Sequence, residues 1–226
     1  MTSSFSGDGA FGLLFLASSA LPTGSFAWSQ GLEAAATAGL FSGPKDLENY
    51  LNDVLMGSLA YFDLPLLNRA FLAATRKDEA ALLDYSLWIL AGRETRELFQ
   101  AEKDMGRALG RLIKSLGPPA FWGGEDLGYL AALALLAATF FPELKPQDLA
   151  KAFAYGFLEN QLAAASRLSL VSQTEARRII LALKDTVFDA VQKALSLPLA
   201  AIGSQLINLA IFSSRHETQE ARLFRS

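Results

Sequence analysis

The sequence contains no cysteine and a single histidine, His216, among its 226 residues. The absence of cysteine excludes disulfides, thiolate catalysis, iron–sulfur clusters and cysteine zinc sites. One histidine excludes a histidine cluster within the chain, so carboxylates are the only plentiful ligands for a divalent metal. We therefore expect the chain to bind no metal or other cofactor directly.

Charge is also sparse, because only 19% of the residues are Asp, Glu, Lys or Arg. The 23 acidic and 20 basic side chains give a formal charge of −3, and the isoelectric point is near 5.3. This balance argues against general binding to the phosphate backbone of nucleic acids. Hydrophobic residues make up 51% of the chain, which argues against disorder and predicts a large core, a membrane contact or an apolar surface kept for a partner.

No hydrophobic run is long enough to favour the membrane. Leu127–Phe141 has 15 residues, fewer than the roughly 20 that span a bilayer. Phe11–Leu16 followed by Ala-Ser-Ser-Ala imitates a signal peptide, but no Lys or Arg precedes Lys45 and Asp8 lies where positive charge is needed. We predict a cytoplasmic protein without membrane contact.

Helical periodicity dominates the chain, and no stretch alternates apolar and polar residues over the length of a strand. The clearest helix starts at Pro44, and its apolar residues follow the spacing of one buried face: Leu47, Tyr50, Leu51, Val54, Leu55, Leu59 and Phe62. Ser172 and Glu175 have the spacing of a capping box. The sequence predicts one all-α domain over residues 1–226, a bundle of about nine helices with short loops.

Several helix boundaries follow from the same patterns. Asp63-Leu64-Pro65 is expected to bend or restart the first of these helices, and Asp78 to cap the next one. An amphipathic helix is expected from Arg93 to Leu116, burying Leu98, Met105, Leu109, Leu112, Ile113 and Leu116. One helix should follow the capping box as far as Pro198, and the last helix should end near Ser213.

The catalytic templates that we considered fail. Gly39–Lys45 only superficially suggests a phosphate loop, because the spacing is wrong and no strand precedes it. There is no G-x-S-x-G turn, and a serine triad would need His216, ten residues from the C-terminus, where a buried, oriented base is not expected. His216–Glu220 lacks the second His of H-E-x-x-H. We predict that the chain is not an enzyme.

Two charged segments stand out. Arg107, Arg111 and Lys114 form a basic stripe, for which a solvated helix face is the favoured interpretation. In the tail Arg215–Ser226, arginines alternate with apolar residues. The tail is either a frayed terminus or an arm that becomes ordered against a partner.

Three segments make the chain resemble the UreF family of urease accessory proteins over essentially its whole length. They are Leu21–Glu33, which reads LPTGSFAWSQGLE, the charged stretch Arg93–Arg107, and the terminal residues Arg215–Ser226, which read RHETQEARLFRS. The chain departs from the family pattern at Glu220-Ala221, where Tyr-Ser is usual, and at Leu168–Gln173, which lacks a Pro and a Gly.

The resemblance implies a non-catalytic, dimeric factor for urease maturation that binds UreD (also called UreH) and recruits the GTPase UreG to apo-urease. Nickel and GTP then belong to the partner system. The implied partner-binding residues are Pro22, Gly24, Phe26, Gln30, Glu33, Arg93, Glu94, Arg107, Arg215, His216, Glu217, Gln219, Arg222, Leu223, Phe224 and Arg225. Two alternatives stay open: a GTPase activator that contributes an arginine, and a direct nickel carrier acting through His216.

Overall fold

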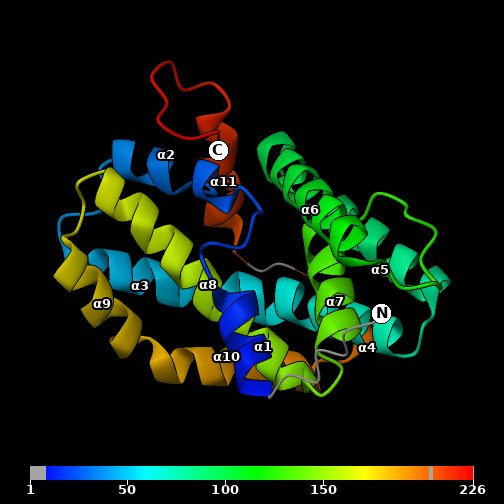
Figure 1. Ribbon diagram of the computed structural model, residues 1–226. Coiled ribbons are helices and arrows are strands. Elements are labelled where there is room, and N and C mark those ends of the chain that lie inside the picture. The colour runs from blue at the N-terminus through cyan, green and yellow to red at the C-terminus, as the bar shows by residue number, and fades with distance from the viewer. Residues whose placement is uncertain (1–8, 204–205, 226) are drawn as a thin grey trace.

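The computed structural model describes residues 9–203 and 206–225, and these residues form helices without any strand. Figure 1 shows the arrangement. The α-helices are α1 (Gly9–Ala17), α2 (Leu32–Thr37), α3 (Pro44–Val54), α4 (Leu64–Thr75), α5 (Glu79–Ala91), α6 (Arg96–Leu116), α7 (Tyr129–Phe140), α8 (Pro146–Arg167), α9 (Gln173–Ala182), α10 (Lys184–Ser196) and α11 (Ile207–His216). Two 3-10 turns, η1 (Ser25–Ala27) and η3 (Leu199–Ala201), and one π-helix, η2 (Leu55–Asp63), complete the set.

An α-helix restarts at Asp63-Leu64-Pro65, one of the two expected outcomes, because η2 ends at Asp63 and α4 begins at Leu64; no loop separates them, and helical structure continues from Pro44 to Thr75. Pro65 has no N–H to donate to the carbonyl of Tyr61, four residues earlier. The N–H of Gly203 donates to that carbonyl instead, at 3.0 Å. A distant segment thus supplies the hydrogen bond that the proline removes, and the rod survives.

The prediction of one helix between Ser172 and Pro198 is wrong, since Leu183 separates α9 from α10. The capping box at the start of α9 is confirmed, and Asp78 caps α5 by accepting from the N–H of Ala81 at 3.0 Å. The described residues form eleven α-helices, close to the nine that the sequence predicts.

Helix α7 occupies the centre of the bundle, packed mainly against α4 and α6 (Figure 1). Every residue from Leu130 to Ala137 is buried, as its uniformly apolar sequence predicts. The face of α3 predicted to be buried, with its continuation into η2, joins this core. In the described part of the chain, no helix is both long enough and apolar enough to cross a membrane.

Helix α6 is amphipathic as expected, but it begins at Arg96 rather than Arg93. Thr95 fixes this start, because its hydroxyl accepts a hydrogen bond from the N–H of Leu98. Four of the six predicted core residues are buried, whereas Leu112 is half-buried and Leu116 is 51% exposed. The last turn of α6 therefore extends beyond the core.

The crossing of α6 with the chain entering α7 depends on Gly106. A Cβ atom at this position would lie 2.1 Å from the carbonyl oxygen of Leu127 and 2.7 Å from the carbonyl carbon of Gly128. Both atoms belong to the backbone, so no side chain can rotate away. The contact explains why a glycine interrupts the buried face of α6.

We predict that Gly106→Ala lowers the free energy of unfolding by about 3 kcal/mol, as overpacking of a rigid contact does. Gly110→Ala is the matched control on the same helix, because its Cβ would meet only the ring of Trp122, at 4.0 Å. The control should be neutral or stabilising, since alanine favours helix by about 1 kcal/mol. Urea denaturation measures both variants, and equal stability would contradict the account of the crossing.

Candidate functional site

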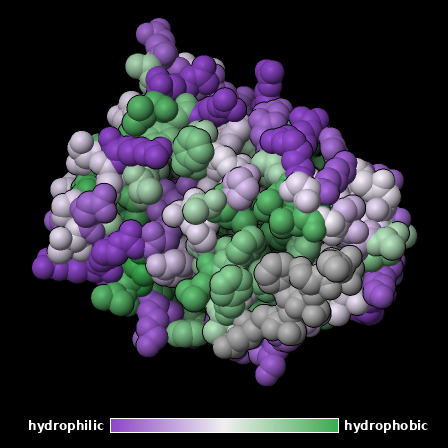
Figure 2. Space-filling model, in the orientation of Figure 1, coloured by the Kyte–Doolittle hydropathy of each residue, from purple (hydrophilic) through white to green (hydrophobic). Residues whose placement is uncertain are grey.

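A cavity of about 420 Å³ lies where the end of α1, residues 18–30, η2, α6 and α8 meet. Its walls combine apolar with polar and charged side chains, and apolar side chains gather in the middle of the face shown in Figure 2. Four of the predicted partner-binding residues line it: Phe26, Gln30, Arg93 and Glu94. Sequence segments that the resemblance singled out are therefore neighbours in space.

Arg93 forms a largely buried ion-pair group at this cavity. Its guanidinium donates to Asp63 Oδ1 at 2.8 Å and to Glu102 Oε2 at 2.6 Å, and it lies over the ring of Phe62. Burial opposes the charge of Arg93, but the two carboxylates outweigh it and raise the pKa of the guanidinium above its ordinary value. With 14% of its side chain exposed, Arg93 shapes the cavity, whereas Glu94 beside it is exposed.

Glu102 extends this group to the start of α7. Its second carboxylate oxygen accepts the N–H of Leu130 at 2.9 Å, which places a negative charge at the N-terminus of that helix. Burial, with a smaller contribution from Glu102, raises the pKa of Tyr129. The charged group thus connects η2, α6 and α7.

The tail is anchored by a second buried group around His216. The prediction that His216 would not be a buried, oriented side chain is wrong: its exposed fraction is 0%. Its Nδ1 lies 2.9 Å from Glu97 Oε2 and its Nε2 lies 3.0 Å from Glu33 Oε2. Each ring nitrogen therefore faces a carboxylate oxygen, and the imidazole ring bridges Glu33 and Glu97.

The tail boundary predicted at Arg215 also needs correction, because α11 continues past Ser213 to His216. Ser213 is buried, and its hydroxyl shares a 2.7 Å hydrogen bond with that of Thr95, the N-cap of α6. Arg215 and His216 therefore belong to the last turn of a packed helix. The separate tail begins at Glu217.

Residues 217–225 of the tail lie against the chain itself, so the frayed-terminus interpretation is wrong for them. Glu33 accepts hydrogen bonds from the backbone N–H groups of Leu223, at 2.7 Å, and Phe224, at 2.9 Å. Arg222 pairs with Glu97 at 3.2 Å. Phe224 is buried, whereas Leu223 is 62% exposed.

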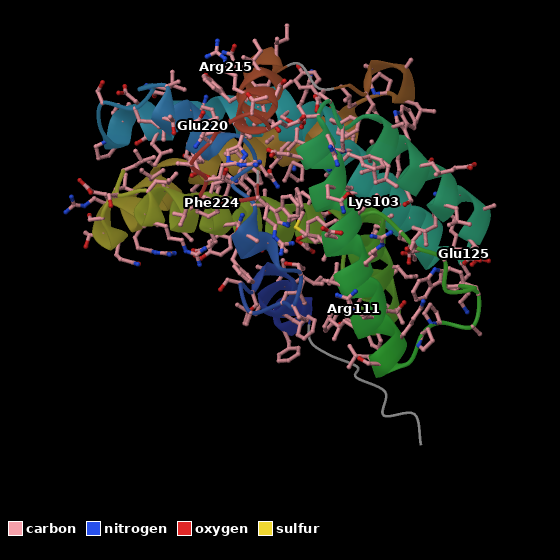
Figure 3. All side chains as sticks on the ribbon, turned by 90° about the horizontal axis from the view of Figure 1, so that it is seen from above. Lys103, Arg111, Glu125, Arg215, Glu220 and Phe224 are labelled. Atoms are coloured by element: carbon pink, nitrogen blue, oxygen red, sulfur yellow. The ribbon has the colours of Figure 1, made fainter. Side chains whose placement is uncertain are left out.

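The N-terminal signature segment meets the tail. The N–H of Arg225 donates to the carbonyl of Ala27 at 2.8 Å, and the guanidinium of Arg167 lies over the rings of both Phe26 and Phe224. Pro22 is exposed, and Gly24 has a φ of 73°, which favours glycine. Figure 3 shows Phe224 with Glu220 and Arg215 in the region of α11.

Arg107 is a predicted site residue that the structure brings neither to the cavity nor to the tail. It pairs with Asp104 and Asp126 on the exposed side of α6. Arg111, four residues along this helix, lies apart from Glu220 and Phe224 in Figure 3. Its surroundings fit the solvated helix face that the sequence favoured.

Sequence reasoning missed Asp63, Glu102, Asn160 and Arg167. A signal existed only for Glu102, because its position between Leu98 and Met105 places it on the buried face of α6. Among the described residues, no group of three or more His, Asp or Glu side chains is placed to hold a metal ion.

We predict that His216→Ala lowers the free energy of unfolding by about 3 kcal/mol, because it leaves two buried carboxylates facing an empty position. Arg215→Ala is the matched control, since Arg215 is the exposed neighbour, and its effect should stay within about 0.5 kcal/mol. Urea denaturation followed by circular dichroism measures both. A His216 variant as stable as the control would show that the buried group does not hold the tail.

Comparison with known proteins shows the family of the chain. The family model for UreF matches residues 41–184. The chain is 40% identical over 219 residues to the urease accessory protein UreF of Chromohalobacter salexigens, covering 95% of this chain and 94% of the relative. It is 38% identical over 221 residues to UreF of Psychrobacter cryohalolentis, covering 95% and 93%, and 37% identical over 217 residues to UreF of Citrobacter koseri, covering 95% and 96%. The chain belongs to the UreF family of urease accessory proteins.

Proposed function

We propose that this protein is a non-catalytic scaffold that joins a UreD-type protein and the GTPase UreG on apo-urease while nickel, the cargo, is inserted. The observation that carries the proposal is the folded tail. Buried hydrogen bonds that involve Glu33, Glu97 and His216 fix the tail in place. Other side chains of the tail, such as Leu223, are exposed. A preformed surface binds a partner without the full entropic cost of ordering a free arm.

The outward face of this region combines apolar and basic side chains. Leu223 is 62% exposed and Phe26 is 64% exposed, and Arg167 links their segments by contacting both Phe26 and Phe224. Exposed apolar side chains contribute to association when a partner removes them from water. The UreD-type partner is the proposed occupant, because the tail is the segment that carries the resemblance most specifically.

We predict that Leu223→Ala and Phe26→Ala each weaken binding to UreD at least tenfold, with helical circular dichroism unchanged because both side chains are exposed. Leu181→Ala on α9 is the control, since Leu181 is 73% exposed and lies outside the tail region. Titration of labelled UreD gives the three affinities. Wild-type affinity in both test variants would show that the exposed side chains of the tail region do not bind UreD.

Family membership supports the remaining parts of the proposal: a homodimer, recruitment of UreG and a cytoplasmic location. Direct nickel carriage through His216 is disfavoured, because both ring nitrogens face carboxylates and the side chain is fully buried. Nickel is therefore treated as the cargo of the assembly.

One observation favours the alternative of a GTPase activator. Arg93, Arg107 and Arg222 are held in ion pairs. Arg111 is exposed, has no ionic partner among the described residues, and lines a hollow of about 170 Å³ on α6. An arginine that is free in this way can approach a transferring phosphoryl group.

Turnover of GTP by UreG separates the two functions. The scaffold proposal predicts the same rate with and without this protein, and no effect of Arg111→Ala. An activator would raise the rate, and Arg111→Ala would abolish the rise while the exposed control Arg76→Ala would not. Stimulation that depends on Arg111 would replace the scaffold proposal by the activator.

A further inference from the structure

Residues 25–28 form a part of the cavity wall that contains little regular helix. They contain only the short turn η1, which follows Gly24 in a left-handed conformation. Three consecutive carbonyl groups bind this segment to its surroundings. Arg167 donates to Phe26 at 2.9 Å, the N–H of Arg225 donates to Ala27 at 2.8 Å, and Asn160 donates to Trp28 at 3.2 Å.

The middle one of these three bonds comes from the tail, and the other two come from α8. The tail adds two ring contacts: Phe224 shares the guanidinium of Arg167 with Phe26, and the guanidinium of Arg225 lies over Trp28. Because the segment has little internal hydrogen bonding, these contacts decide how closely it lies against the body of the protein.

Residues 25–28 are also coupled to the inside of the cavity. Ser25 and Phe26 line it, as do Ala101 and Met105 of α6. Trp28 is buried in a small apolar cluster with Ala101 and Met105. A movement of the segment away from α6 would therefore uncover these two cavity residues.

We infer that residues 217–225 act as a strap that holds residues 25–28 over the part of the cavity formed by Ala101 and Met105, so that release of the tail exposes these two residues to solvent. The hinge end of the strap is the buried group of His216, Glu33 and Glu97, and its free end is the contact of Phe224 and Arg225 with residues 26–28. The strap is a property of the isolated chain. Its test needs no partner, and its failure leaves the proposed function intact.

The natural absence of cysteine makes the test direct. Ala101→Cys places one small thiol in the buried part of the cavity wall, since Ala101 is 2% exposed. Ending this chain at Ala221 removes the free end of the strap and keeps α11 with His216. Reaction with a thiol-specific chromophore should be at least fivefold faster in the shortened chain. Leu223→Ala in the full-length reporter is the matched control, because Leu223 is exposed, and it should leave the rate unchanged.

Two further reporters separate exposure of position 101 from other effects. A thiol at exposed Leu181 should react equally fast in both chain lengths, and a thiol at Ala132, which is 0% exposed in α7, should stay unreactive in both. An unchanged rate at position 101 in the folded, shortened chain overturns the inference, and so does equal acceleration at position 132, which reports global unfolding. If the shortened chain does not fold, Phe224→Ala in the full-length reporter is judged by the same criteria.

Discussion

The buried hydrogen-bonded group of Glu33, His216 and Glu97 is the interaction that joins α2, α6 and α11 and on which the path of the tail depends. Two carboxylates removed from water are costly unless they are paired, because the protein interior screens charge poorly. The ring of His216 lies between them and the guanidinium of Arg222 pairs with Glu97. Two backbone N–H groups of the tail also donate hydrogen bonds to Glu33. Breaking such a group is costly, so it fixes the path of the tail.

A second buried group, formed by Arg93, Asp63 and Glu102, lines the cavity. Arg93 joins Asp63 of η2 to Glu102 of α6, and Glu102 also accepts from the first turn of α7. Gly106 lets the backbone pass close to α6 one turn later. The two groups lie on one helix, because Glu97 and Glu102 both belong to α6. This helix therefore organises both the cavity and the tail.

Apolar spacing predicted the helices because helix burial depends on local periodicity. The face of α3 is confirmed for that reason. The cap at Asp78 and the capping box at Ser172 are confirmed because capping depends on polar side chains and N–H groups only three residues apart. The restart at Pro65 was predicted, but the hydrogen bond from the N–H of Gly203 to Tyr61 was not, because Gly203 lies far along the chain. His216 was misjudged in the same way, since nothing near it in the sequence shows that Glu33 and Glu97 will enclose it. The site consists of long-range polar contacts, which carry no periodic signal.

The central claim is that the folded tail is the surface on which the UreF-family scaffold meets its partners. Size-exclusion chromatography after co-expression with UreD and UreG tests it most directly, with the full chain compared with the chain that ends at Ala221. The account predicts one peak containing all three proteins for the full chain, and separate elution of the shortened chain while circular dichroism still shows it folded. Co-elution of the folded, shortened chain with UreD and UreG would contradict the account.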